Sequence, residues 1–267
     1  MVLSRFAAFL DPGGVLAPKE ITRAHVNAYA DSIGDRSEHY RADTLRMLKA
    51  FFGRLAATGR LLLNPASHLR LPRLKFQPVV PLSERDMRRL LDAPDTDTVC
   101  GLRDRAMLEV LYATGMRSGE LRLLKLQDVD LSERQCFIQK GKGSKGRWVP
   151  LTEEACRFTA AYLEASRPRL VGTRPTPYLF PNRRGGRMSA VGLGERCHHY
   201  ARQAGLPRPV WPHLLRHTAA CHLLEGGASL FHIQKLLGHV NATTTQRYTH
   251  MSAGHLKDVL KACHPRP

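Results

Sequence analysis

Proline punctuates one short stretch of this chain, and this feature strongly limits the folds available to it. The prolines are Pro65, Pro72, Pro78 and Pro81. Proline cannot donate a backbone hydrogen bond inside a helix, and it biases the residue before it towards an extended conformation. We therefore expect an extended linker at residues 76–81, which separates a first domain, 1–75, from a second domain, 82–267.

Apolar residues recur at helical spacing on both sides of this linker. In the first domain, Leu45, Leu48 and Phe52 would lie on one face of a helix. The helices expected in the first domain are the end of one at 5–10 and two more at 18–33 and 38–58. A serine N-cap at Ser83 predicts a helix that runs to about residue 91. The other helices expected in the second domain are 102–114, 152–166, 189–204, 213–225, 229–237 and 252–262.

The helical spacing of apolar residues gives way to a strand-like pattern between Val129 and Pro150. Residues 136–138 and 148–150 are typical of two short strands, and the turn at 141–146, rich in glycine and lysine, would join them into a hairpin. This turn lacks the spacing of a nucleotide-binding loop and leads into a strand, so we expect no nucleotide site there. The sequence predicts a mainly α fold with a small antiparallel β-sheet (α+β), with helices alone in the first domain.

The chain is strongly basic. Its 267 residues include 41 Lys plus Arg against 23 Asp plus Glu, which gives a net charge of +18. Such a charge favours a polyanionic partner, and double-stranded DNA is the partner we expect. No apolar run is long enough for a membrane span and no secretory signal is visible, so we expect a cytoplasmic protein without a membrane partner. Its 6 cysteines form no metal-binding pattern, and no zinc site is expected.

Several short motifs follow one another in the second domain. Residues 113–121 read Ala-Thr-Gly-Met-Arg-Ser-Gly-Glu-Leu and contain Arg117. His213 and Arg216 are three residues apart, so they share one face of a helix. The sequence Leu-Gly-His ends at His239, and Tyr248 follows nine residues later (248 − 239 = 9).

These residue types suit the cutting and rejoining of DNA without a metal. A tyrosine can attack phosphorus and conserve the bond energy in a covalent phosphoester. The guanidinium fork of arginine matches the non-bridging oxygens and stabilises the charge that builds on them. A lysine or a histidine can protonate the leaving 5′ oxygen.

In order and spacing, these motifs resemble the tyrosine recombinase (phage integrase) family over roughly residues 82–267. The family pattern is an arginine in A-T-G-x-R-x-x-E-L, then H-x-x-R-H, then L-G-H, then a tyrosine about nine residues on. The ending Cys-His-Pro-Arg-Pro is similar to the tail of Xer-type recombinases. The resemblance implies a site-specific DNA recombinase or integrase that acts through a 3′-phosphotyrosyl intermediate and a Holliday junction, with no metal or other cofactor.

The resemblance also implies a role for each matching residue. Arg117 and Arg216 would bind the scissile phosphate. His213 and His239 would contact that phosphate or assist proton transfer. Tyr248 would be the nucleophile.

The general acid is less sharply defined. Lys142, in the Gly-Lys-Gly of the turn, matches the family's lysine acid for the 5′ oxygen, and Lys145 in the same turn is the alternative. Each predicted site residue also has a simpler interpretation. An arginine can form an ion pair at a helix end, a histidine can begin or cap a helix, and a tyrosine can be merely half-buried.

The first domain resembles the family's core-type DNA-binding domain in position and helical pattern only. Family members usually begin with a longer first helix, so either this domain is short or the natural start lies upstream. The two domains would form a clamp around DNA. The recombinase would act as a homo-tetramer, or as a hetero-tetramer with a second recombinase.

Two questions stay open at the level of sequence. Leu256, Val259 and Leu260 form an apolar stripe, which would pack on its own domain or dock into a neighbouring subunit. Two other functions also fit the residues: DNA relaxation of the type IB topoisomerase kind, and a non-catalytic DNA-binding regulator with the same fold.

Overall fold

The chain divides into two compact units, Met1–Pro78 and Val79–Pro267. The computed structural model describes residues 2–13, 17–72, 79–139, 146–173, 175–238 and 253–266. The division falls inside the proline-rich stretch that we expect to be a linker. The DNA-binding role of the first unit remains a prediction.

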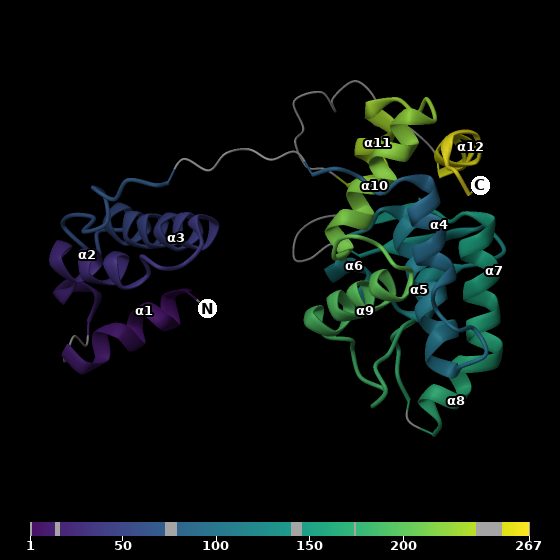
Figure 1. The fold of residues 1–267 in the computed structure, drawn as a ribbon, viewed down its shortest axis with the longest axis horizontal. Coiled ribbons are helices and arrows are strands. Elements are labelled where there is room, and N and C mark those ends of the chain that lie inside the picture. Colours follow the sequence, from purple (N-terminus) through teal and green to yellow (C-terminus); the bar gives the residue numbers. More distant parts are fainter. Residues whose placement is uncertain are drawn as a thin grey trace. The chain divides into compact units, whose positions relative to one another are not determined.

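Unit 1 is built from helices (Figure 1). They pack around aromatic side chains. The helices are α1 (Val2–Leu10), α2 (Arg23–Ser32) and α3 (Glu38–Ala57), with 3-10 turns at Asp11–Gly13 and Pro18–Glu20. The Phe6 ring meets the rings of Tyr29 and Phe52 edge-on, with centroids 5.0 and 6.0 Å apart. Such contacts add to the free energy gained by burying the rings.

The helix expected at 18–33 is interrupted before α2. Thr22 has an extended backbone, and its hydroxyl accepts a hydrogen bond from the His25 backbone N–H. This bond satisfies one of the free N–H groups at the start of α2. The helix therefore starts at the Thr22 cap, although the apolar pattern continues before it.

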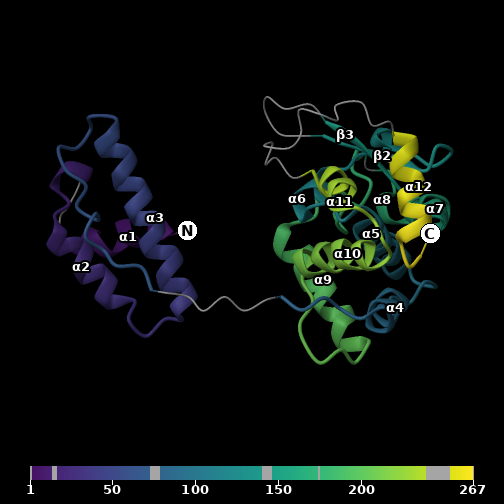
Figure 2. The ribbon, with the colours of Figure 1, turned by 90° about the horizontal axis from the view of Figure 1, so that it is seen from above.

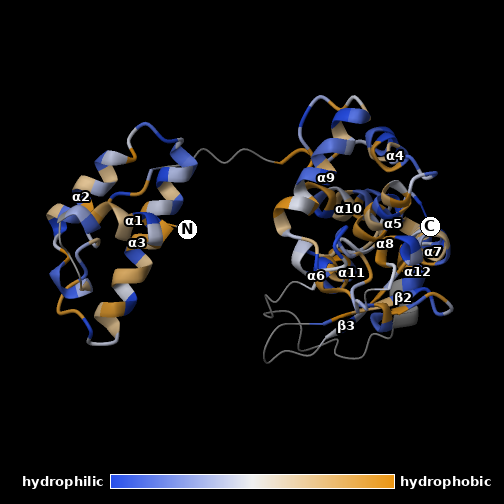
Figure 3. Cartoon of the chain, turned by 90° about the horizontal axis from the view of Figure 1, so that it is seen from below, coloured by the Kyte–Doolittle hydropathy of each residue, from blue (hydrophilic) through white to orange (hydrophobic). Residues whose placement is uncertain are grey.

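Helices make up most of unit 2, and α5 lies at its centre (Figure 2). The helices are α4 (Glu84–Asp92), α5 (Val99–Thr114), α6 (Ser118–Leu123), α7 (Glu153–Ala161), α8 (Arg167–Val171), α9 (Ala190–Gln203), α10 (Pro212–Glu225), α11 (Leu230–Leu237) and α12 (Ala253–Cys263). Helix α5 packs against α4, α7, α8 and α10. Figure 3 shows both hydrophobic and hydrophilic segments on most of the helices.

The central helix α5 carries charges that are withdrawn from water. Its buried charged residues are Arg103, Asp104, Arg105 and Glu109. Arg103 and Asp104 form an ion pair of 2.7 Å. Glu109 pairs with Arg105 at 3.0 Å and with Arg266, from the end of the chain, at 3.1 Å. Each of these pairs offsets part of the cost of removing its charges from water.

A small antiparallel sheet completes unit 2, with a 3-10 turn at Leu126–Asp128 leading into it. Its strands are β1 (Val129–Asp130), β2 (Gln135–Ile138) and β3 (Arg147–Pro150), in the order β1-β2-β3. Ile138 of β2 is paired with Arg147 of β3, and Cys136 with Val149. The predicted α+β fold with a small antiparallel sheet is thus confirmed, and β1 is a strand that the sequence pattern did not specify.

The C-terminal helix α12 packs on its own unit. Leu260 is buried in the same core as Leu223 and Leu236, and Val259 packs against that core. The side chain of Leu256 lies outside the described residues. Val259 and Leu260 thus pack within the chain in this structure, and docking of the stripe into a neighbouring subunit stays a prediction. Within the described ranges, no helix combines the length and the apolar character needed to cross a bilayer.

A cluster of arginines at the candidate active site

A tight turn after α5 brings Arg117 to the start of α6. Gly115 ends α5 with a positive φ of 57°, a conformation that glycine adopts without steric cost. The Thr114 hydroxyl donates to the carbonyl of Val110 at 2.7 Å and accepts from the Met116 N–H at 3.2 Å. A Cβ at position 115 would lie 2.5 Å from the end of the Leu237 side chain, which would have to shift to make room for it.

Arg117 is fixed by the first turn of α6. Its backbone N–H donates to Glu120 Oε2 at 2.7 Å, and its Nη1 donates to Glu120 Oε1 at 3.3 Å. Its Nη2 donates to the carbonyl of Gly238 at 3.4 Å. The Arg117 side chain is still 43% exposed, so part of the guanidinium remains open to a ligand.

Arg216 approaches the same point from α10. Its Nη1 donates to the carbonyl of Gly115 at 2.7 Å, and its Nη2 donates to the carbonyl of Leu237 at 2.9 Å. The residue is buried. Burial first, and then the nearby charge of Arg117, lower the pKa of Arg216 to about 10. The side chain therefore stays charged at neutral pH, although it is held in an unfavourable environment for a cation.

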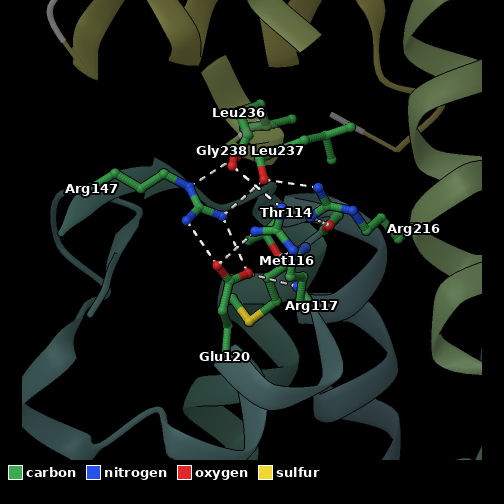
Figure 4. A network of polar contacts seen from close by, with 10 residues as sticks. Thr114, Met116, Arg117, Glu120, Arg147, Arg216, Leu236, Leu237 and Gly238 are labelled. Carbon is green, nitrogen blue, oxygen red and sulfur yellow. Dashed lines mark hydrogen bonds and ion pairs between the residues drawn. The ribbon is translucent and has the colours of Figure 1, made fainter. Parts of the chain in front are cut away.

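Arg147, the first residue of β3, joins this cluster from the sheet. Its Nη1 and Nη2 donate to the two carboxylate oxygens of Glu120, at 2.9 and 3.3 Å. Its Nε donates to the carbonyl of Leu236 at 3.2 Å, and Nη2 also donates to that of Leu237 at 3.3 Å. Figure 4 shows Arg117 and Arg147 bonded to Glu120, while all three arginines, Arg216 included, bond to carbonyls at the C-terminal end of α11.

The charges in this cluster do not balance. Three guanidinium groups face one carboxylate, that of Glu120. Burial alone would raise the pKa of Glu120, but hydrogen bonds from Arg147 and from the Arg117 backbone, with the charges of both arginines, lower it overall. Glu120 is therefore ionised at neutral pH. The remaining positive charge suits an anion such as a phosphate.

His213 lies near this cluster in sequence but forms no bond to it. It occupies the first turn of α10, one turn before Arg216, and its side chain is exposed. Within the described ranges, no hydrogen bond engages its ring. The structure therefore leaves His213 free to contact a ligand, but it does not fix the ring in a working position.

The same described ranges hold no group of three or more His, Cys, Asp or Glu side chains able to bind a metal ion.

Lys142, with its alternative Lys145, His239 and Tyr248 lie outside the described residues. Two residues of the arginine cluster lie close in the sequence to these undescribed positions. Arg147 follows the lysine-rich turn closely in the sequence, and Gly238 immediately precedes His239. The structure brings Arg117 and Arg216 together, and the other predicted site residues remain predictions.

Two residues of the cluster, Glu120 and Arg147, were not predicted as site residues. The pattern Arg-x-x-Glu, three residues apart, could have identified Glu120, because a glutamate at that spacing often bonds back to the helix start. Arg147 could have been found from strand alternation. It shares a face with buried Val149 while Trp148 points to solvent, so its charge needs a partner inside.

Comparison with known proteins places this geometry in a family. The family model described as the phage integrase family matches residues 81–255. The tyrosine recombinase XerD of Pseudomonas aeruginosa is 41% identical, over 99% of this chain and 89% of the relative. The chain belongs to the phage integrase family. Tyrosine recombinase XerC 2 of Ralstonia nicotianae is 37% identical, over 98% of this chain and 78% of the relative.

Solved structures of this family share the fold. A crystal structure of XerA recombinase is 30% identical, with a TM-score of 0.55, and covers 100% of this chain and 90% of its own. The structure of XerH site-specific recombinase bound to its difH substrate has a TM-score of 0.66 at 21% identity, over 92% of this chain and 68% of its own.

This phage integrase family member is a Xer-like tyrosine recombinase, an enzyme of site-specific DNA recombination through tyrosine chemistry. The predictions of the family and of the enzyme class are confirmed. The curated relatives named above are recombinases, which favours recombination over the topoisomerase and regulator hypotheses.

Proposed function

We propose that the arginine cluster binds the scissile phosphate of double-stranded DNA. Arg117 and Arg216 would donate to its non-bridging oxygens, and His213 and His239 would contact the same group. The observation that carries this proposal is the excess of positive charge around Glu120, with Arg117 partly open to solvent. A phosphate would complete a cluster that the protein's own carboxylate only partly neutralises.

Strand cleavage would follow from this arrangement. The Tyr248 hydroxyl gives its proton to His213 or His239, and its oxygen attacks phosphorus to form a 3′-phosphotyrosyl bond, while the bond from phosphorus to the 5′ oxygen breaks. Lys142 gives its proton to that leaving oxygen, and the arginines stabilise the charge on the phosphoryl oxygens. Attack by a 5′ hydroxyl from a second duplex then releases Tyr248 and joins the strands. Exchange in two such rounds passes through a Holliday junction.

The assembly follows from the same chemistry. Exchange between two duplexes needs four cleavable strands, so we propose a tetramer on DNA, formed by this chain alone or with a second recombinase. Unit 1 would also bind the DNA. The site of action would be the cytoplasm.

A trapping experiment tests the proposal. A duplex selected for binding from a random pool, and nicked next to the cleavage position, would lose its short 5′-hydroxyl fragment after cleavage and leave the covalent adduct. We expect a protein–DNA band on a denaturing gel that Tyr248→Phe abolishes. An adduct that persists in Tyr248→Phe would remove Tyr248 from its role, and no adduct with the unaltered protein would refute the function.

A further inference from the structure

Arg147 holds together three segments of unit 2 that are far apart in the sequence. It begins β3, it pairs with Glu120 of α6, and it donates to two carbonyls at the end of α11. No other side chain drawn in Figure 4 bonds both to the Glu120 carboxylate and to the Leu236 carbonyl. We propose that Arg147 is a positioning residue for strand cleavage, which sets Arg117 through Glu120 and ties it to the end of α11.

The link from Arg147 to Arg117 runs through the Glu120 carboxylate. Each oxygen of the Glu120 carboxylate accepts one bond from Arg147 and one from Arg117. Glu120 is therefore held between the two arginines, and its orientation decides where the Arg117 guanidinium lies. Without Arg147, Glu120 would be free to turn and pair fully with Arg117, which would draw that guanidinium away from a phosphate.

The link from Arg147 to α11 acts on the same phosphate site. The Leu237 carbonyl accepts from Arg147 and also from Arg216. Arg147 thereby fixes the acceptor that orients the second phosphate-binding arginine. The next residues along the chain, from His239 to Tyr248, begin at this helix end.

The fork of an arginine is needed for this role. Arg147 uses Nε, Nη1 and Nη2 on acceptors that lie in different directions, and its side chain is only 14% exposed. Lysine carries the same charge as a compact point and cannot reproduce a planar fork. Arg147→Lys therefore keeps the positive charge but removes the fork geometry, so it tests the two contributions separately.

The test compares Arg147→Ala and Arg147→Lys with a matched control, Arg88→Ala. Arg88 is an exposed arginine of the same unit, and its ion pair with Glu84 spans one helical turn. The measurements are the single-turnover rate of adduct formation at saturating DNA, the DNA Kd and the Tm. The inference rests on the function proposed above, so the adduct of the unaltered protein is measured first.

We expect Arg147→Ala to slow adduct formation about 30-fold and Arg147→Lys about tenfold, because misplaced catalytic groups cost rate steeply. The DNA Kd should change by less than about threefold, because the displaced contacts act mainly in the transition state. Arg88→Ala should match the unaltered protein. Wild-type cleavage rates in Arg147→Ala would overturn the inference, and so would a large loss of DNA affinity, which would make Arg147 a DNA contact.

A second substrate distinguishes positioning from general damage to the fold. A methylphosphonate at the scissile position replaces one charged oxygen with a methyl group, so the linkage is neutral and depends less on arginine charge. On this substrate the rates of Arg147→Ala and of the unaltered protein should agree within about threefold, as expected if the lost function is charge stabilisation. An equal deficit on both substrates would refute positioning. Absence of an adduct with the unaltered protein would instead refute the proposed function itself.

Discussion

Replacing Gly238 with alanine should destabilise unit 2 by more than backbone strain alone. Gly238 has a φ of +65°, and a Cβ at this position would lie 2.7 Å from the guanidinium of Arg147. The left-handed backbone costs alanine about 1–2 kcal/mol. Displacing the guanidinium would weaken bonds to Leu236 and Leu237, at about 1.5–3 kcal/mol for a charged hydrogen bond. We expect a total loss of about 2.5–5 kcal/mol.

The control for this change is Gly227→Ala. Gly227 has a φ of +94°, and a Cβ at this position would meet nothing within 4 Å, so it carries strain without a collision. Thermal unfolding should lower the Tm by about 10 °C for Gly238→Ala and by about 4 °C for Gly227→Ala, at about 2–4 °C per kcal/mol for a domain of this size. Equal losses in the two variants would show that the Arg147 contact is not limiting.

Three further predictions follow from the arginine cluster and from the charge of the chain. Arg216→Ala should slow adduct formation by about 100-fold or more, from lost stabilisation of the transition state; a near-normal single-turnover rate would remove Arg216 from the site. Glu120→Gln should lower the free energy of unfolding by about 3 kcal/mol at pH 7. Because the folded-state pKa of Glu120 is lowered, this deficit should shrink as the pH falls below about 4.5 and through the folded pKa, and urea titrations at several pH values that give a constant deficit would contradict it. The DNA affinity should fall steeply with salt, with a log–log slope of about −0.9 per neutralised phosphate; a flat slope in an anisotropy titration would contradict the charge argument.

Much of the fold was predictable because the residues that start or end a helix lie at the helix ends in the sequence. Ser83 caps α4 as expected, through a bond from the Asp86 N–H. The start of α5 was expected too late, at 102, and the residue before it, Gly101, has a low helix propensity. In the structure Thr98 caps α5, and Gly101 is required because a Cβ there would lie 1.8 Å from a backbone oxygen of Asp95. A glycine that looks like a break is here a packing contact.

The helix expected at 152–166 is also too short, but at its C-terminal end. The expected end falls just before Pro168, which cannot donate a helical hydrogen bond. In the structure the helix continues through a π-helical turn, Tyr162–Ser166, into α8, which ends at Val171. The wider turn accommodates the missing donor, and Tyr162 is held by its hydroxyl bond to the Leu179 carbonyl. Such long-range contacts are not visible in a local pattern.

The candidate site was only partly predictable, for a related reason. Arg117 and Arg216 belong to motifs whose order is legible in the sequence. Arg147 depends on which strand face points inwards and on the carbonyls at the end of α11, which only the tertiary structure brings together. The residues next to Arg147 in the sequence therefore give little indication of its role, because the backbone groups that bind its charge lie far away in the sequence.

The paired charges buried in α5 restrict how this domain can change over evolutionary time. Loss of one partner, as in Asp104→Asn, would strand the Arg103 charge and cost about 3–5 kcal/mol, whereas apolar residues that replaced a whole pair would cost little. Glu109 extends this dependence to Arg266, at the far end of the chain. Both members of a buried ion pair in this helix must therefore change together. A substitution at Arg266 in the C-terminal tail also changes which residues are tolerated at position 109 of α5.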